Sequence, residues 1–347
     1  MLRIRSDVIT SIHNAKKAPD LFQYLQNAIE LEHSTIPPYL QALYSIRRDS
    51  QANQIAAALI RSIVTEEMLH MTIAANVLNA IGGHPVISSP KFIPNYPGPL
   101  PMVHEGLIVG LKPVSLNLIL NTFMEIETPE DPQHFPVKMA ALASTEYGTI
   151  GLFYAAIMDK LKEFGNRIFV GDPNRQVVDN DWFPADQLFP IRNVDSAVRG
   201  LEIIMRQGEG TSKDPLDGAG APAHYYRFAE IYYGKRLVPD SSVKEGYSYS
   251  GAPIPFDPAG VWNMIPNPKA ADYPADSQPR LAAERFNGIY TNLLNSLHRT
   301  VNGKPRHLAM AIGGMYELRL AAEALIELTL PSGQQAAPTF EFAMENA

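Results

Sequence analysis

The chain has 347 residues, of which 46% are hydrophobic and 19% charged, and its formal net charge at pH 7 is −7. This is the composition of an ordinary folded globular protein, and the negative balance argues against nucleic acid or an anionic membrane surface as a partner. The sequence contains no cysteine, which excludes disulfides, thiolate nucleophiles, iron–sulfur clusters and cysteine-based zinc sites. Any metal must therefore be held by histidines and carboxylates.

No segment of the sequence approaches the ~20 consecutive apolar residues of a membrane span, and the amino terminus lacks the apolar core of a signal peptide. We therefore expect a cytoplasmic protein that neither enters a membrane nor binds nucleic acid. The expected partner is a small-molecule substrate, and the composition leaves a homodimer open.

Apolar residues recur at helical spacing in several long segments, whereas strand signals are scarce, so the predicted fold class is all-α. The first helix covers about 21–45, and the second covers about 55–81, where "GGHP" marks its end. The remaining predicted helices, in chain order, cover about 114–127, 137–163, 194–208, 223–234, 280–300 and 307–328.

Two proline-rich connections separate these helices. Residues 85–113 form a long, stiff crossover, and a second region rich in proline and tyrosine lies between the sixth and seventh predicted helices. We therefore divide the chain into a metal-binding bundle (1–235), a connecting region (236–280) and C-terminal helices packed on the bundle (281–347).

The sharpest chemical signal is "TEEMLHM", in which Glu67 and His70 are three residues apart and so share one face of the second helix. Helical bundles use this Glu-x-x-His spacing to offer a carboxylate and an imidazole to one metal. Both residues fall on the apolar face with Ile63 and Ala74, and a carboxylate in a core is costly unless it is paired or coordinated. The neighbouring Glu66 is expected to point away from the core into solvent.

The first helix offers a second inward carboxylate. Glu32 shares a stripe with Leu25 and Ala28, whereas Glu30 lies off that stripe. We favour Glu32 as a metal ligand, with the alternative that it is a buried structural acid, and His33 as an outer contact or alternative ligand.

Pro37 and Pro38 follow within one turn of these residues. A proline inside a helix removes a backbone hydrogen bond, so the pair predicts either a distortion of the helix beside the site or the start of a new helix capped by Ser34 or Thr35.

Four further residues are candidates of different kinds. Glu146 precedes an inward apolar series on the fourth helix, and Glu209 lies between two glycines in "QGEG". His224 opens "HYYRFAEIYYG" on its apolar face, where a structural histidine is equally compatible. Glu127 has inward spacing with Phe123, but "ETPEDP" ends that helix, and exposure is the favoured interpretation. The candidate metal set is therefore Glu32, Glu67, His70, Glu146, Glu209 and His224.

Other chemistries have little support. The sequence has no zinc-protease motif, no nucleophile elbow and no phosphate-binding loop. Carboxylates combined with a few histidines suit non-haem iron, with manganese as the alternative, while zinc usually recruits more histidine or cysteine.

Several motifs in sequence order, "LEHSTIPPYLQALYSI", "EEMLHMTIAANVLNAIGGHP", "TIGLFYAAI", "QGEG", "HYYRF" and "FNGIYTNLLNSLHRTVNG", resemble the iminophenyl-pyruvate dimer synthase family. The resemblance spans about residues 20–325, and the chain is expected to be a free-standing form of that domain. It implies a ferritin-like four-helix bundle with long Pro-rich crossovers and extra C-terminal helices, and an iron site onto which Glu32, Glu67 and His70 map. Glu209 and His224 match its later motifs, while a second Glu-x-x-His is missing.

The expected function is that of an iron-dependent oxidoreductase, with one or two iron ions, that acts with dioxygen or peroxide on a small organic substrate. The resemblance implies that an amino-acid-derived imine is one such substrate. Two alternatives remain open: an iron-handling ferroxidase or storage protein, and a metal-free helical scaffold that binds a partner.

Overall fold

The structure, a computed structural model, describes the chain except residues 1–3, 104–105, 130–146, 180, 211–213 and 344–347. Within the described residues the fold is mostly helical, which confirms the predicted all-α class. The main helical elements are α1 (Ser6–His13), α2 (Phe22–Tyr44), α3 (Gln54–Ala80), α4 (Leu116–Leu118), η3 (Ile119–Phe123), α5 (Met124–Ile126), α6 (Ile150–Phe164), α7 (Val194–Glu209), α8 (His224–Tyr233), α9 (Gln278–Val301) and α10 (Leu308–Ile326). Two short antiparallel pairs join β1 (Ile4–Arg5) to β2 (Tyr147–Gly148), and β3 (Val238–Pro239) to β4 (Tyr247–Ser248).

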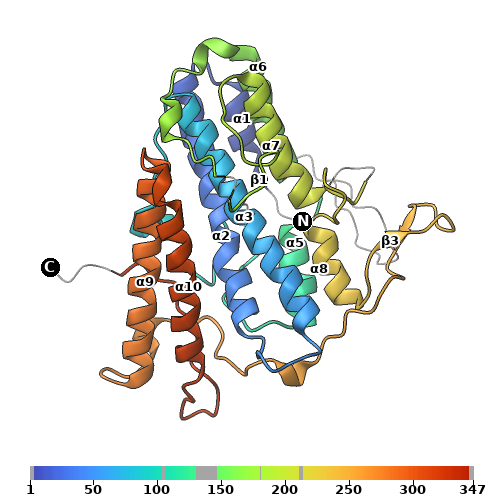
Figure 1. Cartoon of the computed structure of the whole chain (residues 1–347), viewed down its shortest axis with the longest axis vertical. Coiled ribbons are helices and arrows are strands. Elements are labelled where there is room, and N and C mark those ends of the chain that lie inside the picture. Colours follow the sequence, from blue (N-terminus) through green and yellow to red (C-terminus); the bar gives the residue numbers. More distant parts are fainter. Residues whose placement is uncertain (1–3, 104–105, 130–146, 180, 211–213, 344–347) are drawn as a thin grey trace.

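The two longest helices of the bundle, α2 and α3, pack side by side along its centre (Figure 1). The connection of residues 45–53 is short, so the two helices run antiparallel. Both helices are buried around most of their circumference, because α7 and α8 pack on α3 while α9 and α10 pack on the other side of the pair. A helix of this kind sits in the middle of a core rather than on its surface.

The helix α2 continues through Pro37 and Pro38 without interruption. The prediction of a new helix starting at Ser34 or Thr35 is therefore wrong. Pro38 has no N–H to offer the carbonyl of Ser34, and the hydroxyl of Tyr96 donates to that carbonyl instead, at 2.7 Å. Tyr96, which lies in the proline-rich crossover, thus replaces the helical hydrogen bond that Pro38 removes.

The segment predicted as the third helix contains a π turn. Residues Ile119–Phe123 adopt this wider turn between α4 and α5, and the backbone N–H of Glu127 still donates to the carbonyl of Phe123. Such turns commonly occur near functional sites because they shift the angular position of the residues that follow. Here the π turn sets the position of Glu127 at the end of α5.

The fourth predicted helix begins later than its apolar spacing suggests. The hydroxyl of Thr149 accepts from the N–H of Leu152, so Thr149 is the N-cap of α6. Tyr147 and Gly148 pair with β1 instead of extending the helix. The expected start at residue 137 is therefore wrong over 147–149, and residues 137–146 lie outside the described part of the chain.

The C-terminal helices α9 and α10 form a hairpin that lies against one side of α2 and α3 (Figure 1). One continuous hydrophobic cluster includes residues of the bundle, such as Ile60, and of the hairpin, such as Leu294 and Leu318. The proposed division at residues 235 and 280 stays a prediction. Among the helices that the structure describes, none combines the length and apolar character needed to cross a membrane.

Candidate metal centre

Two groups of three side chains meet in the middle of the bundle. In each group, one potential ligand atom per residue lies within 4.8 Å of the others: the first group is Glu32, Glu67 and His70, and the second is Glu67, Glu127 and His224. All five side chains are buried. Glu67 belongs to both groups, so the two potential metal positions share one carboxylate.

The first group is built from α2 and α3. Nδ1 of His70 lies 3.4 Å from Oε2 of Glu32, and the other oxygen of Glu32 accepts a hydrogen bond from the hydroxyl of Tyr154. The second ring nitrogen of His70, Nε2, lies 2.9 Å from Oε1 of Gln207 on α7. This outer contact fixes the tautomer of the ring with Nδ1 free to face the carboxylates, as is usual for metal-ligating histidines.

The second group joins α3 to the end of α5 and the start of α8. Nδ1 of His224 lies 2.9 Å from Oε1 of Glu67 and 3.6 Å from Oε2 of Glu127. The hydroxyl of Tyr39 donates to the other oxygen of Glu127. Each of the two outer carboxylates is thus held on one oxygen by a buried tyrosine, which leaves its second oxygen directed toward the histidine of its group.

The hydrogen bonding of His224 gives a second reason, besides the residue types, why this group fits a metal ion. Nδ1 of His224 is fully buried and close to two carboxylate oxygens, yet among the described residues it has no hydrogen-bond partner of acceptable geometry. A shared ligand at the point where these atoms converge would satisfy all three. A cavity of about 30 Å³ adjoins the group, lined by Glu32, Glu67, His70 and Glu127 and by apolar residues that include Ile126, Ile150 and Ile204.

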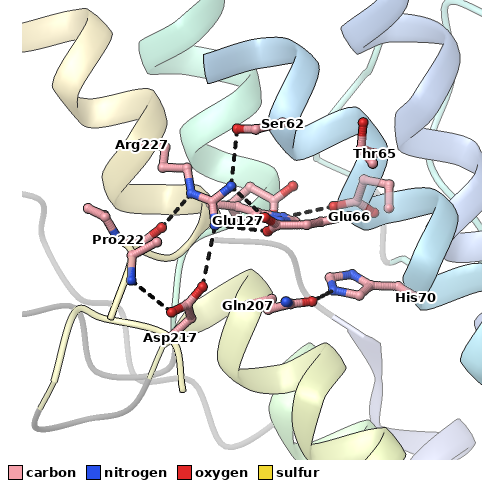
Figure 2. A network of polar contacts seen from close by, with 12 residues as sticks. Ser62, Thr65, Glu66, His70, Glu127, Gln207, Asp217, Pro222 and Arg227 are labelled. Atoms are coloured by element: carbon pink, nitrogen blue, oxygen red, sulfur yellow. Dashed lines mark hydrogen bonds and ion pairs between the residues drawn. The ribbon is translucent and has the colours of Figure 1, made fainter. Parts of the chain in front are cut away.

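An ionic network centred on Arg227 connects α8 to α3 (Figure 2). Nε2 of His224 lies 2.9 Å from Oε2 of Glu66, and Arg227 on α8 contacts both oxygens of Glu66 at 2.8 and 2.9 Å. Arg227 also lies 3.6 Å from the carboxylate of Asp217 and donates to the carbonyl of Pro222. The network links the segment before α8 to α3, and it fixes the imidazole with Nδ1 toward Glu67 and Glu127.

The carboxylates of the site differ in their pKa values because their partners differ. Burial raises the pKa of Glu67 to about 8, and the charges of Glu127 and Glu32 add to this effect. Burial alone would also raise the pKa of Glu66, but its contacts with His224 and Arg227 lower it to about 2. In Glu32 the contacts with His70 and Tyr154 likewise overcome the effect of burial, so its pKa is lowered.

Both histidines have raised pKa values despite burial, which by itself lowers the pKa of an imidazole. Glu32 and Glu67 raise the pKa of His70, and Glu127, Glu66 and Glu67 raise that of His224 well above its ordinary value. The excess of buried negative charge thus attracts protons to these rings. A divalent cation would satisfy the same charge, since metal ligands bind in their deprotonated forms.

The structure brings four of the six predicted ligands together: Glu32, Glu67, His70 and His224. Glu146 lies outside the described residues, and the strand at Tyr147–Gly148 interrupts the helical register that made it a candidate. Glu209 ends α7, and its side chain lies outside the described part of the structure.

Three expectations are corrected. Glu127 is not exposed: its side chain is buried between α2 and α8, which pack over the end of α5. Glu66 does not point into solvent but contacts His224 and Arg227. His33 is not a ligand of this centre, because its Nε2 lies 2.8 Å from the hydroxyl of Tyr290 on α9, on the other side of α2. The inward spacing of Glu127 with Phe123 was the sequence signal for its role.

The carboxylates and histidines in the middle of a helical bundle define a metal-binding class of fold. The chain matches a family model described as ferritin-like over residues 25–233, and it belongs to the ferritin-like family. A crystal structure of a ferritin-like protein from Caulobacter vibrioides is similar, with 25% sequence identity, a TM-score of 0.60 and coverage of 92% of this chain and 97% of that chain. The comparison with curated proteins found no match.

Di-metal bundles of the ferritin-like kind draw one Glu from each of two helices and a Glu-x-x-His pair from each of the other two. In this chain α2 and the end of α5 supply Glu32 and Glu127, and α3 supplies the complete pair. The remaining helix, α8, supplies only His224, because Ala221 stands three residues before it. The arrangement therefore retains one shared carboxylate, Glu67, where the common pattern has two.

Proposed function

We propose that the chain is a non-haem oxidoreductase with a two-metal centre that acts with dioxygen or peroxide on a small organic substrate. The observation that carries the proposal is the position of Glu67, which is common to both groups of potential ligands. A carboxylate shared in this way is how helical bundles hold two metal ions a few ångströms apart. Among the described residues, no other buried acid occupies such a position.

The set of donor atoms supports iron, with manganese as the alternative. The two positions together draw on three carboxylates and two imidazoles, a mixture of oxygen and nitrogen ligands that suits these metals, whereas structural zinc sites usually contain sulfur or more histidine. The excess of negative charge also favours the binding of two divalent cations, because each one offsets carboxylate charge that would otherwise be buried.

The chain itself would position the metals and keep bulk water away. Bound iron would supply the redox chemistry and the binding of the oxidant. Tyr154 and Tyr39 each hold one oxygen of an outer carboxylate, so these carboxylates would be preorganised for the metals. The apolar lining of the cavity would exclude bulk water.

The size of the cavity bears on the choice between the candidate functions. A water-sized probe occupies about 10–15 Å³, so a cavity of about 30 Å³ has room for dioxygen or peroxide and not for a large organic molecule. This observation favours a second candidate, a ferroxidase, in which Fe(II) itself is the substrate. For the oxidoreductase, the substrate class suggested by the motifs is an amino-acid-derived imine, which would have to bind at the edge of this cavity.

The amount of iron oxidised separates the two candidates. Metal-free protein is given increasing Fe(II) without oxygen and is then mixed with oxygenated buffer, and oxidised iron is counted per chain. A ferroxidase continues beyond two iron ions per chain and forms mineral. The proposed oxidoreductase stops at two, and consumes further oxygen only when a 2-imino acid, generated from an amino acid by an oxidase, is added. Glu67→Gln is the control for both activities, and a wild-type chain that binds no metal would contradict both.

A further inference from the structure

The pair of helices that carries the first group of ligands has a second cavity on its opposite side. Three of its wall residues, His33, Met68 and Met71, each directly follow a residue of that first group in the sequence. The other wall residues come mostly from α9 and α10, so this cavity, of about 70 Å³, lies between the bundle and the C-terminal hairpin. The helices α2 and α3 thus lie between the metal centre and this second cavity.

The wall of this cavity is apolar apart from a small polar spot. Leucine, isoleucine, methionine and alanine side chains line most of it, and the polar exceptions are His33, Tyr290 and Thr72. The hydroxyl of Thr72 donates to the carbonyl of Met68 in its own helix, at 2.8 Å. The polar groups that face a potential ligand are therefore those of His33 and Tyr290.

His33 has an unfilled hydrogen-bonding position. Its side chain is buried, Nε2 lies 2.8 Å from the hydroxyl of Tyr290, and Nδ1 has no partner among the described residues. Either tautomer leaves this position unfilled: Nδ1 carries a proton with no acceptor if Tyr290 donates to Nε2, and is a free acceptor if Nε2 donates to Tyr290. A buried polar atom without a partner is unfavourable, and natural cores rarely contain one without a reason.

A water molecule is a poor partner for this nitrogen. Buried waters typically make about three hydrogen bonds, and apolar cavities without enough polar groups stay dry. Here the wall offers, besides His33, only the hydroxyls of Tyr290 and Thr72 as polar partners, and each already makes one hydrogen bond. A molecule that fills the space with apolar atoms and places a single polar group on Nδ1 matches the wall better than water does.

We propose that this cavity is a second binding site, separate from the metal centre, for a small and largely apolar molecule with one hydroxyl or carbonyl group that hydrogen-bonds to Nδ1 of His33. A dry cavity of about 150 Å³ admits benzene, so a cavity of about 70 Å³ suits a ligand of a few carbon atoms. Met68, Met71 and Met315 on its wall can adjust to ligands of different shape, because methionine is unbranched and flexible.

Three small probes of similar size test the proposal on the metal-loaded protein: acetone, 2-propanol and 2-methylpropene, the last of which has a carbon in place of the carbonyl oxygen of acetone. The readout is the NMR signal of the Met315 methyl group in protein labelled at methionine. Met315 lines the cavity from α10, away from the metal ligands, and the exposed Met310 on the same helix is the internal control. We expect a saturable shift of Met315 and none of Met310.

We expect the protein to bind one of the two oxygenated probes with about fivefold higher affinity than the hydrocarbon. This ratio corresponds to the net contribution of one ordinary hydrogen bond. His33→Phe should abolish this preference while hydrocarbon binding persists. Ala311→Leu should abolish the binding of all three probes by filling the cavity, and Ala309→Leu, at an exposed position of the same helix, should change nothing. The proposal is overturned if no probe shifts Met315, if neither oxygenated probe is preferred, or if Ala311→Leu leaves binding intact.

Discussion

Nδ1 of His224, at the start of α8, lies 2.9 Å from Oε1 of Glu67, in the middle of α3. Glu67 is also grouped with Glu32 and His70 on its other side. One carboxylate therefore connects two sets of potential ligands from helices that are far apart in the sequence. Most consequences of the account can be tested at this residue.

Replacing Glu67 should have a larger effect on metal content than replacing either histidine. Glu67→Gln should lose most of both metal ions, because the shared ligand is removed, whereas His70→Ala and His224→Ala should each retain about half of the wild-type metal. Elemental analysis per folded chain measures this directly, with Glu284→Gln, an exposed acid on α9, as the control. Equal losses in all three variants would argue for a single metal position.

The same substitution should stabilise the metal-free protein. The pKa of Glu67 is raised from 4.5 to about 8, so the folded state binds this proton more tightly than the unfolded chain does. The stability that depends on Glu67 is therefore greatest below pH 4.5 and is lost as the pH rises toward 8. At pH 7, Glu67→Gln without metal should be more stable than the wild type by roughly 1–3 kcal/mol.

Urea unfolding in the presence of a chelator measures this difference at two pH values. The gain should shrink at about pH 4.5, where the wild-type carboxyl is protonated in the folded state and about half protonated in the unfolded chain. A gain that is the same at both values, or a loss of stability at pH 7, would contradict the raised pKa.

Metal affinity should increase with pH. Glu67, His70 and His224 all have raised pKa values in the absence of metal, and each must release its proton before it can act as a ligand. The dissociation constant should therefore fall as the pH rises from about 6 to about 8. Calorimetry in two buffers with different ionisation enthalpies would show protons released on binding, and an absence of proton release would be inconsistent with this set of ligands.

The helices of the bundle could largely be predicted from the sequence because their apolar spacing and end signals are local. Glu32, Glu67 and His70 followed from the same reasoning, since each faces inward on a long amphipathic helix. Glu127 could not be assigned, because its burial depends on α2 and α8 packing over the end of α5. That packing involves residues distant in the sequence, and a single sequence gives no information about it.

The start of α6 and the position of Glu66 both depend on residues that are distant in the sequence. Apolar spacing continues before Ile150, but β2 pairs with β1 near the amino terminus of the chain. The helix α6 therefore begins only after its N-cap, Thr149. Glu66 lies beside the inward face of α3. Its ion pair with Arg227 on α8 becomes visible only in the folded structure.

The contact between Glu66 and Arg227 should support the His224 side of the centre. Arg227→Met keeps much of the packing but removes the charge that holds Glu66, so we expect metal affinity at the second position to fall about 10–100-fold, as is typical for outer contacts of metal ligands. The first position should keep its affinity. Metal titration followed by a spectroscopic signal of each site measures this, and Arg236→Met, which removes the similar ion pair with Glu230, is a matched control.

The hydrogen bond from Tyr96 to Ser34 should depend on Pro38. Tyr96→Phe leaves the buried carbonyl of Ser34 without a partner and should cost about 1–3 kcal/mol. In a Pro38→Ala background the restored N–H can donate to that carbonyl within the helix, so the cost of Tyr96→Phe should be smaller. A double-mutant cycle in urea measures the coupling, and additive effects would show that Tyr96 does not replace the bond that Pro38 removes.

The most direct test of a two-metal centre is anomalous scattering at the iron absorption edge from crystals of protein purified without chelators. The account predicts two peaks on opposite sides of Glu67, one among Glu32, Glu67 and His70 and the other among Glu67, Glu127 and His224. A single peak, peaks that do not contact Glu67, or the absence of any peak in protein reconstituted with Fe(II) would contradict it.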